Sequence, residues 1–244
     1  MSHPNRERAD RILDAAGELL LRMGYRKVAI DDIARAVGIG KGTVYLHWRN
    51  KELLFQALMM RESADLTDEI LESIKADPAM ILPHRMISSS FLVTHRRPLV
   101  MAMLRGNAEM FGSLGDLALR KQQDELRGQF EDAMLRRGLI RADVPNVSYA
   151  LNAATLGFYL GDTLSDEFEG IALEEKAAVL AHIVRTAFEP AGEPDPRAVA
   201  DVAAELGSAL EALVSGYRKG IYAHDPAKAP GAIPGPHRGK KGRT

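Results

Sequence analysis

The residues of this chain best suited to binding chemistry lie in one short run, Lys41–His47, which reads KGTVYLH. An ammonium, a hydroxyl, a phenol and an imidazole group occur within this run. Such groups donate hydrogen bonds to phosphate oxygens and to base edges in the major groove of DNA. Ordinary core packing would explain the apolar positions of the run but not this cluster of polar donors. We therefore interpret it as a recognition helix.

Other chemistries have no supporting sequence pattern. The chain has no cysteine, which excludes disulfides, thiolate metal sites and cysteine nucleophiles. His47 has no second ligand at metal-binding spacing, so we predict no metal site. No HExxH, GxSxG or Walker-type run occurs. We therefore predict that the protein is not an enzyme and needs no cofactor.

A recognition helix must be held by a second helix and a tight turn, and the preceding residues can form both. Ala34 is small enough for close helix approach, and Gly38 can take the positive φ that the turn requires. The apolar residues that would lock the two helices together are Ile33, Val37, Ile39 and Val44. The spacing predicts helices over 30–37 and 41–48.

Apolar residues recur at three- and four-residue steps along almost the whole chain, which is typical of amphipathic helices. The first predicted helix ends at Gly24, and the fourth starts at Asn50, a good N-cap residue. The other predicted ranges are 50–75, 79–94, 99–111, 114–137, 146–165, 173–189 and 196–218. Because no alternating strand pattern longer than a few residues occurs, we predict an all-α fold.

The motif places these helices in a family. The run IAxxxGIGKGTVYLHWRNKELLF, with the stretch RILDAAGELLLRMGYRKVAIDDIA before it, resembles the signature of TetR regulators over about residues 6–56. Two positions depart from the usual pattern, because Ala29 stands where the family often has Ser or Thr, and Gly40 where it often has Ser. The first change removes a side-chain N-cap, worth ~1 kcal/mol, and the second costs only a few tenths.

The resemblance implies roles for individual residues. Lys41 and the backbone of Gly42 resemble base-contacting positions, and Tyr45 would reach a thymine methyl group or the DNA backbone. Phosphate contacts are implied for Thr43, His47 and Lys51. For Arg35, which points outward, contact with a phosphate and simple solvation stay open. Trp48 is expected to pack between helices.

The resemblance also implies a division of the chain. We expect a helix-turn-helix DNA-binding domain over 1–52 and a helical domain for ligand binding and dimerisation over 53–222. The remaining segment, 223–244, is rich in Pro, Gly, Lys and Arg, and we predict a disordered basic tail. The tail is either an auxiliary DNA contact or a terminus without a role.

Two further sites are expected in the second domain. The dimer interface would use two late helices, with Leu151, Ala154, Phe158, Leu180, Val184 and Ala187, although the same residues could be internal core. The effector pocket is implied by the family, and flexible methionines support it only weakly, because they also suit ordinary cores. Its expected residues are Met59, Met86, Phe91, Met101, Met103, Arg105, Met110, Phe158 and Tyr159.

The expected function is transcriptional regulation. We predict a cytoplasmic homodimeric repressor that binds a palindromic operator in double-stranded DNA and is released by a small, largely apolar effector, with no membrane partner. The charged N-terminus has no apolar signal region. Two rivals stay open: a core that binds a protein partner instead of a small molecule, and a helical scaffold with no DNA function.

Overall fold

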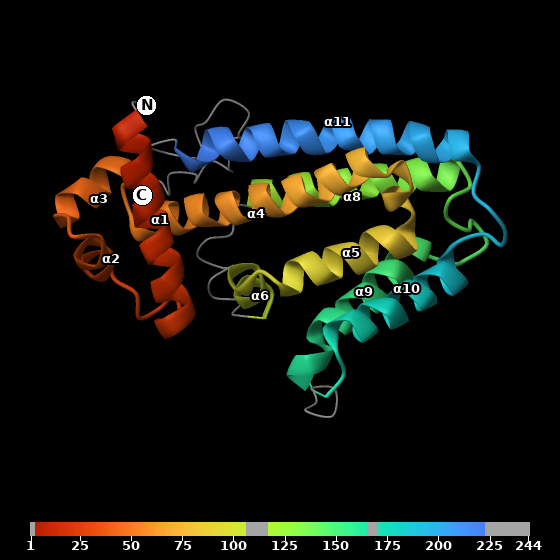
Figure 1. Ribbon diagram of the computed structural model, residues 1–244, viewed down its shortest axis with the longest axis horizontal. Helices are drawn as coiled ribbons and strands as arrows, with labels where there is room; N and C mark the ends of the chain where they lie inside the picture. The colour runs from red at the N-terminus through yellow and green to blue at the C-terminus, as the bar shows by residue number, and fades with distance from the viewer. Residues whose placement is uncertain (1–2, 106–116, 165–169, 223–244) are drawn as a thin grey trace, which may run out of the picture. The chain divides into compact units, whose positions relative to one another are not determined.

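The computed structural model describes residues 3–105, 117–164 and 170–222, and every regular element within these ranges is helical. This confirms the predicted all-α fold. The predicted tail, 223–244, lies outside the described residues. The elements in Figure 1 are α1 (His3–Met23), α2 (Ile30–Val37), α3 (Lys41–His47), α4 (Lys51–Ala76), η1 (Pro78–Ile81), α5 (Pro83–His95), α6 (Pro98–Arg105), α8 (Leu117–Arg136), α9 (Val147–Leu164), α10 (Leu173–Phe188) and α11 (Pro196–Ile221).

One predicted helix is interrupted. The range 79–94 spans most of the short 3₁₀ helix η1 and of the α-helix α5, with Leu82 between them at φ −57° and ψ 135°. A proline disfavours helical backbone in the residue before it, so Pro83 forces Leu82 into an extended conformation and then starts α5. The single-helix prediction was wrong there because it ignored Pro83.

The described residues form two compact units. The first unit comprises residues 3–61, 117–123 and 216–222, and the second comprises residues 62–105, 124–164 and 170–215. Three helices, α4, α8 and α11, contribute residues to both units. The first unit thus contains the predicted helix-turn-helix, the start of α4 and the last turn of α11.

The core of the first unit lies between α1, α2, α3 and the start of α4. Ile12, Ile33, Val44 and Leu54 are completely buried, and α2 packs on both α1 and α3. Trp48 is only 1% exposed, which confirms the prediction that it packs between helices. Burial of these side chains holds α2 and α3 in place, although both are too short to be stable helices alone in water.

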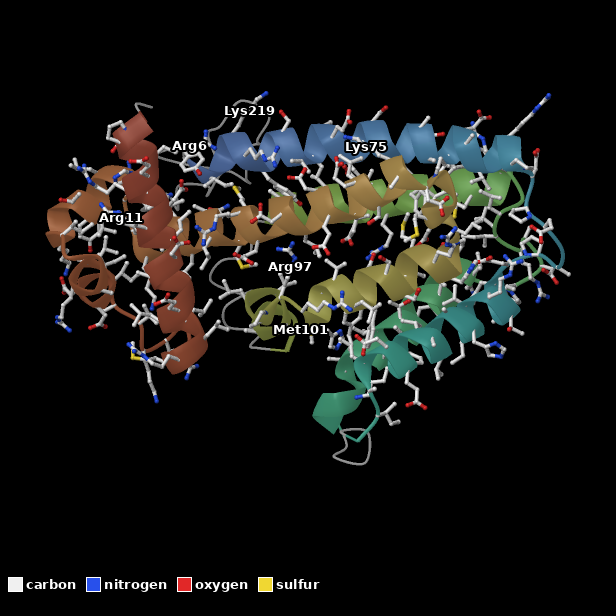
Figure 2. The ribbon with its side chains drawn as sticks, in the orientation of Figure 1. Arg6, Arg11, Lys75, Arg97, Met101 and Lys219 are labelled. Atoms are coloured by element: carbon white, nitrogen blue, oxygen red, sulfur yellow. The ribbon has the colours of Figure 1, made fainter. Side chains whose placement is uncertain are left out.

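The second unit is built around α5, which packs on α10, while α10 also packs on α9 (Figure 1). Its core includes Phe91 of α5, Leu180 and Val184 of α10, and Val202 of α11, all of which are fully buried. The Lys75 ammonium, labelled in Figure 2, pairs with Glu211 at 3.1 Å and so ties α4 to α11 within this unit. Among the described helices, none is both long enough and apolar enough to cross a membrane.

Candidate nucleic-acid interface

The turn between α2 and α3 has the geometry that the sequence predicts. Gly38 lies in the left-handed region at φ 72°, and its N–H donates to the carbonyl of Arg35 at 3.2 Å. The next N–H, that of Ile39, donates to the carbonyl of Ala34 at 3.0 Å. These bonds satisfy carbonyls at the end of α2 and turn the chain sharply into α3. Ala34 is 4% exposed, as expected for close helix approach.

The N-terminus of α2 compensates for the missing side-chain cap at Ala29. The backbone N–H of Ala29 donates to the Asp32 carboxylate at 3.1 Å, which is one half of a capping box. Asp32 also pairs with Arg35 at 3.3 Å. The side chain of Arg35 is 79% exposed, so its guanidinium remains accessible to a partner.

The helix α3 has two different faces. Val44 and His47 are buried, and Thr43 is half-buried. The opposite face carries Gly42, Tyr45 and Leu46, at spacings of three and four residues, and all three are exposed. Because Gly42 has no side chain, this face allows close approach of a partner to the helix backbone.

Leu46 is a candidate contact that was not expected from the sequence. Its side chain is 77% exposed, so it has little packing role within the chain. The signal that could have found it is its position four residues after Gly42, on the same face as Tyr45. An apolar side chain on a recognition helix can contact the methyl group of thymine.

His47 lies on the other face and needs a correction. It is only 8% exposed, and its ring centroid is 5.5 Å from that of Trp48. Residue 47 follows Val44 by three positions and therefore faces the same interior side of the helix. The structure thus supports a packing role for His47 rather than the predicted phosphate contact.

The two lysines of the motif have different surroundings. The Lys41 ammonium is half-exposed and donates to Asp31 at 2.8 Å, and this hydrogen bond raises the pKa of Lys41. The Lys51 ammonium donates to the backbone carbonyl of Tyr25 and lies 4.3 Å from the centroid of the Tyr25 ring. Partial burial lowers the pKa of Lys51. Lys51 therefore ties the loop after α1 to the start of α4.

The first turn of α4 is capped as predicted. The Asn50 side-chain oxygen accepts a hydrogen bond from the backbone N–H of Leu53 at 2.8 Å. Of the predicted DNA-contacting residues, those exposed on the packed pair of helices α2 and α3 are Arg35, Lys41, Gly42 and Tyr45.

Comparisons with known proteins agree with this geometry. The family model for bacterial regulatory proteins of the tetR family matches residues 12–58. The nucleoid occlusion factor SlmA of Haemophilus ducreyi is 30% identical over 138 residues, which cover 55% of this chain and 68% of SlmA. This chain belongs to the TetR family.

Two other similar proteins show how far the likeness extends. The uncharacterized HTH-type transcriptional regulator YvkB of Bacillus subtilis is 32% identical over 97 residues, which cover 39% of this TetR-family chain and only 50% of YvkB. The SmeT–triclosan complex, of the Stenotrophomonas maltophilia repressor, has a TM-score of 0.58 at 22% identity and covers 78% of this chain and 99% of SmeT. At 22% identity, this similarity shows only that the chain and SmeT share a fold.

Some residues predicted for the effector pocket of this TetR-family chain lie together in the second unit. The ring centroid of Phe91 is 6.3 Å from that of Phe158 and 5.3 Å from that of Tyr159. Met86 packs against the same core, whereas Met59 belongs to the first unit. Burial raises the pKa of the Tyr159 phenol.

The remaining pocket candidates are less informative. Met101 is buried, at 6% exposed. The side chains of Met103 and Arg105, and the whole of Met110, lie outside the described residues.

A surface cavity of about 110 Å³ elsewhere in the second unit is lined by Arg137, Arg185 and Glu189, among others. It is smaller than the pockets that usually bind drug-sized ligands.

The predicted dimer residues also need a correction. Leu180 and Val184 have no exposed surface, and Leu151 is 6% exposed, because all three belong to the core of the chain itself. They therefore have almost no surface left to bury against a second copy. Ala154 and Phe158 are half-buried, and Ala187 is exposed. The large apolar side chains exposed on α9 and α10 are instead Tyr149, Leu156, Val179 and Ile183.

Proposed function

We propose that this TetR-family protein is a transcriptional repressor that binds a palindromic operator as a homodimer and is released by a small, largely apolar effector. The observation that carries the proposal is the exposed face of α3, which presents Gly42, Tyr45 and Leu46 while its other face is buried. A short helix with one free face of this composition suits the major groove.

The proposed DNA contacts fall into two groups. Gly42, Tyr45 and Leu46 would approach base edges, because they lie on the free face of α3. Lys41 and Arg35 would contact phosphates, because both cations are accessible and their carboxylate partners are exposed or partly exposed. Phosphate contacts position the protein, whereas base contacts specify the sequence.

Dimerisation is proposed because one short recognition helix contacts too few base pairs to select a site in a genome. The apolar side chains exposed on α9 and α10, Tyr149, Leu156, Val179 and Ile183, are the proposed contacts with the second copy. Two-fold symmetry would place two α3 helices about one turn of DNA apart, ~34 Å, on a palindromic site. Sedimentation of a Leu156→Asp variant as a monomer would support this surface.

The proposed effector site lies at the aromatic cluster of Phe91, Phe158 and Tyr159, which packs in the core of the second unit. An effector releases DNA only if it binds one conformation of the dimer more tightly than the other. A coupling free energy of about 1 to 3 kcal/mol would weaken operator binding roughly 5- to 150-fold. SmeT forms a complex with triclosan, which makes apolar aromatic compounds sensible first probes.

The test compares variants by their affinity for a duplex that the full chain selects from a randomised library. We expect Tyr45→Ala to weaken binding about tenfold or more, because it removes a side chain from the free face. Arg35→Ala should weaken binding and reduce the slope of log affinity against log salt by about 1, as loss of one phosphate contact does.

The matched control is Arg197→Ala, which removes an exposed arginine at the start of α11 in the second unit. Its affinity and its salt slope should equal those of the unmodified chain. The proposal fails if the full chain selects no duplex, or if Tyr45→Ala and Arg197→Ala bind equally well.

A further inference from the structure

Residues 216–222, at the end of α11, have one face buried within the first unit, which also contains the recognition helix. Tyr217 and Ile221 are each 3% exposed. Gly220 lies against Met60 of α4 so closely that a Cβ at this position would be 2.6 Å from the Met60 sulfur. Residues 216–222 therefore form part of the core of the DNA-binding unit, although they come from the far end of the described chain.

This turn is joined directly to the end of α3. The Trp48 indole N–H donates to the carbonyl of Ile221 at 3.3 Å. Trp48 is the C-cap residue of α3, and its backbone N–H donates to the carbonyl of Val44 at 3.0 Å. Ile221 is the last residue of α11, so its carbonyl has no partner within the helix. One buried side chain thus connects the C-terminal ends of both helices.

A second connection reaches α1. The hydroxyl of Tyr222 donates to the Asp10 carboxylate at 2.6 Å, and the Arg6 guanidinium lies 4.6 Å from the centroid of the Tyr222 ring. Figure 2 labels Arg6 on α1 and Lys219 near the end of α11. Burial and the Asp10 hydrogen bond both raise the pKa of Tyr222, as expected for a phenol held in its neutral form.

We propose that residues 216–222 are a positioning element for DNA recognition, which holds the end of α3 against α1 through Trp48 and Tyr222. The inference rests on the proposed function. The family model ends at residue 58, so this segment is not part of the helix-turn-helix that the model describes.

The length of α3 is the physical reason to expect this role. A helix that runs only from Lys41 to His47 has no stable orientation of its own, because helices shorter than about 12 residues are marginal in water. Packing therefore fixes the angle at which its free face meets DNA. Loss of the α11 turn would expose Trp48, remove the partner of its indole N–H and loosen the end of α3.

The fluorescence of Trp48 can report on this contact, because Trp48 is the only tryptophan in the chain. Two truncated chains are compared, one ending after Tyr222 and one ending after Ser215. Each is titrated with the duplex selected by the full chain and with a scrambled duplex, and Trp48 emission and its quenching by acrylamide are recorded. Circular dichroism checks that both chains are helical.

The chain ending at Tyr222 should keep the buried emission of Trp48. The chain ending at Ser215 should show red-shifted, more readily quenched emission and about tenfold weaker binding to the selected duplex, equivalent to about 1.4 kcal/mol. Its affinity for the scrambled duplex should change by less than about threefold, because phosphate contacts dominate non-specific binding. A general loss of stability would not lower specific binding selectively in a chain that is fully folded.

A matched pair of substitutions tests the same point without truncation, in case the shorter chain does not fold. Gly220→Leu places a side chain where even a Cβ would meet Met60, whereas a Cβ at Gly216 meets nothing within 4 Å. Gly220→Leu should therefore reproduce the red shift and the loss of specific binding, and Gly216→Leu should do neither.

Equal emission and equal affinity of Gly220→Leu and Gly216→Leu would overturn the inference, as would equal behaviour of the two truncated chains. A red shift without loss of specific binding would also overturn it, because the turn would then support Trp48 without positioning α3. If the full chain selects no duplex, the proposed function fails and the inference fails with it.

Discussion

The exposed face of α3 in the first unit contrasts with a buried carboxylate in the second unit. In the first unit, α3 keeps a free face with Tyr45 and Leu46 exposed. In the second unit, the Glu189 side chain is only 2% exposed and accepts hydrogen bonds from the backbone N–H of His84 at 2.7 Å and from Arg185 at 2.7 Å. The free face of α3 is therefore open to a partner, whereas the buried Glu189 carboxylate holds α5 and α10 together.

Substitutions in the two sites should therefore change different quantities, DNA affinity for the free face of α3 and the free energy of unfolding for the core of the second unit. Under the proposed function, loss of an exposed side chain on α3 would remove a contact with DNA but few contacts within the chain, so stability should change by less than about 0.5 kcal/mol. Loss of a buried side chain in the second unit should lower the free energy of unfolding instead. The largest effect is therefore expected in the core of the second unit.

Phe91→Ala should lower the free energy of unfolding by about 3 to 5 kcal/mol, because it empties a fully buried position. The centroid of its ring lies 4.0 Å from that of His95 and 5.3 Å from that of Tyr159. Urea denaturation measures the loss, and Tyr45→Ala is the converse control, with weaker DNA binding but nearly unchanged stability. Equal losses of stability in the two variants would remove the distinction between the units.

Glu189→Gln should lower the free energy of unfolding by about 1 to 2 kcal/mol, because the buried carboxylate loses its ion pair with Arg185. The pair Arg141–Asp143 is a matched control, since its N–O distance is also 2.7 Å and its arginine is equally exposed, at 38%. Asp143, however, is 70% exposed. Asp143→Asn should therefore leave stability within the error of urea denaturation, and a loss equal to that of Glu189→Gln would contradict the argument from burial.

A pair of glycines sharpens the comparison within the first unit. Gly38→Ala should cost about 1 kcal/mol of stability, because alanine is strained at φ 72°, and a Cβ there meets nothing within 4 Å. Gly42→Ala should stabilise α3 by about 0.5 kcal/mol, because alanine favours helix and a Cβ there also meets nothing. Gly42→Ala should nevertheless weaken operator binding, measured by fluorescence anisotropy. Unchanged affinity would show that DNA does not approach this backbone.

Local features of the sequence predicted most of the helices and the turn. Gly38 adopts the positive φ of the turn without steric cost. Helical spacing identifies the buried side of α2. The same spacing could not show which neighbour covers an apolar face. Leu180 and Val184 were therefore expected at a dimer interface, although the core of the same chain covers them.

Long-range packing was the least predictable feature of the candidate site. Trp48 and Ile221 are separated by 173 positions, and no local pattern links an indole to the carbonyl at the end of a distant helix. The burial of His47 could have been predicted from its spacing to Val44, but its polar side chain suggested a phosphate contact instead. The resemblance to TetR regulators implied a phosphate contact at residue 47, whereas the helical spacing of this chain predicts a buried side chain there.

Leu46 gives the smallest expected effect on DNA affinity and the most specific test of the free face of α3. Replacing a thymine of the selected duplex by uracil removes only one methyl group, worth about 0.8 kcal/mol when buried against an apolar side chain. Uracil at one or more positions should therefore weaken binding of the full chain about two- to fourfold. The Leu46→Ala variant should bind more weakly to the thymine duplex and show a smaller uracil effect at the same position. If the uracil effect is the same for both proteins at every position, Leu46 does not read thymine, and the free face recognises DNA through Tyr45 and the backbone at Gly42 instead.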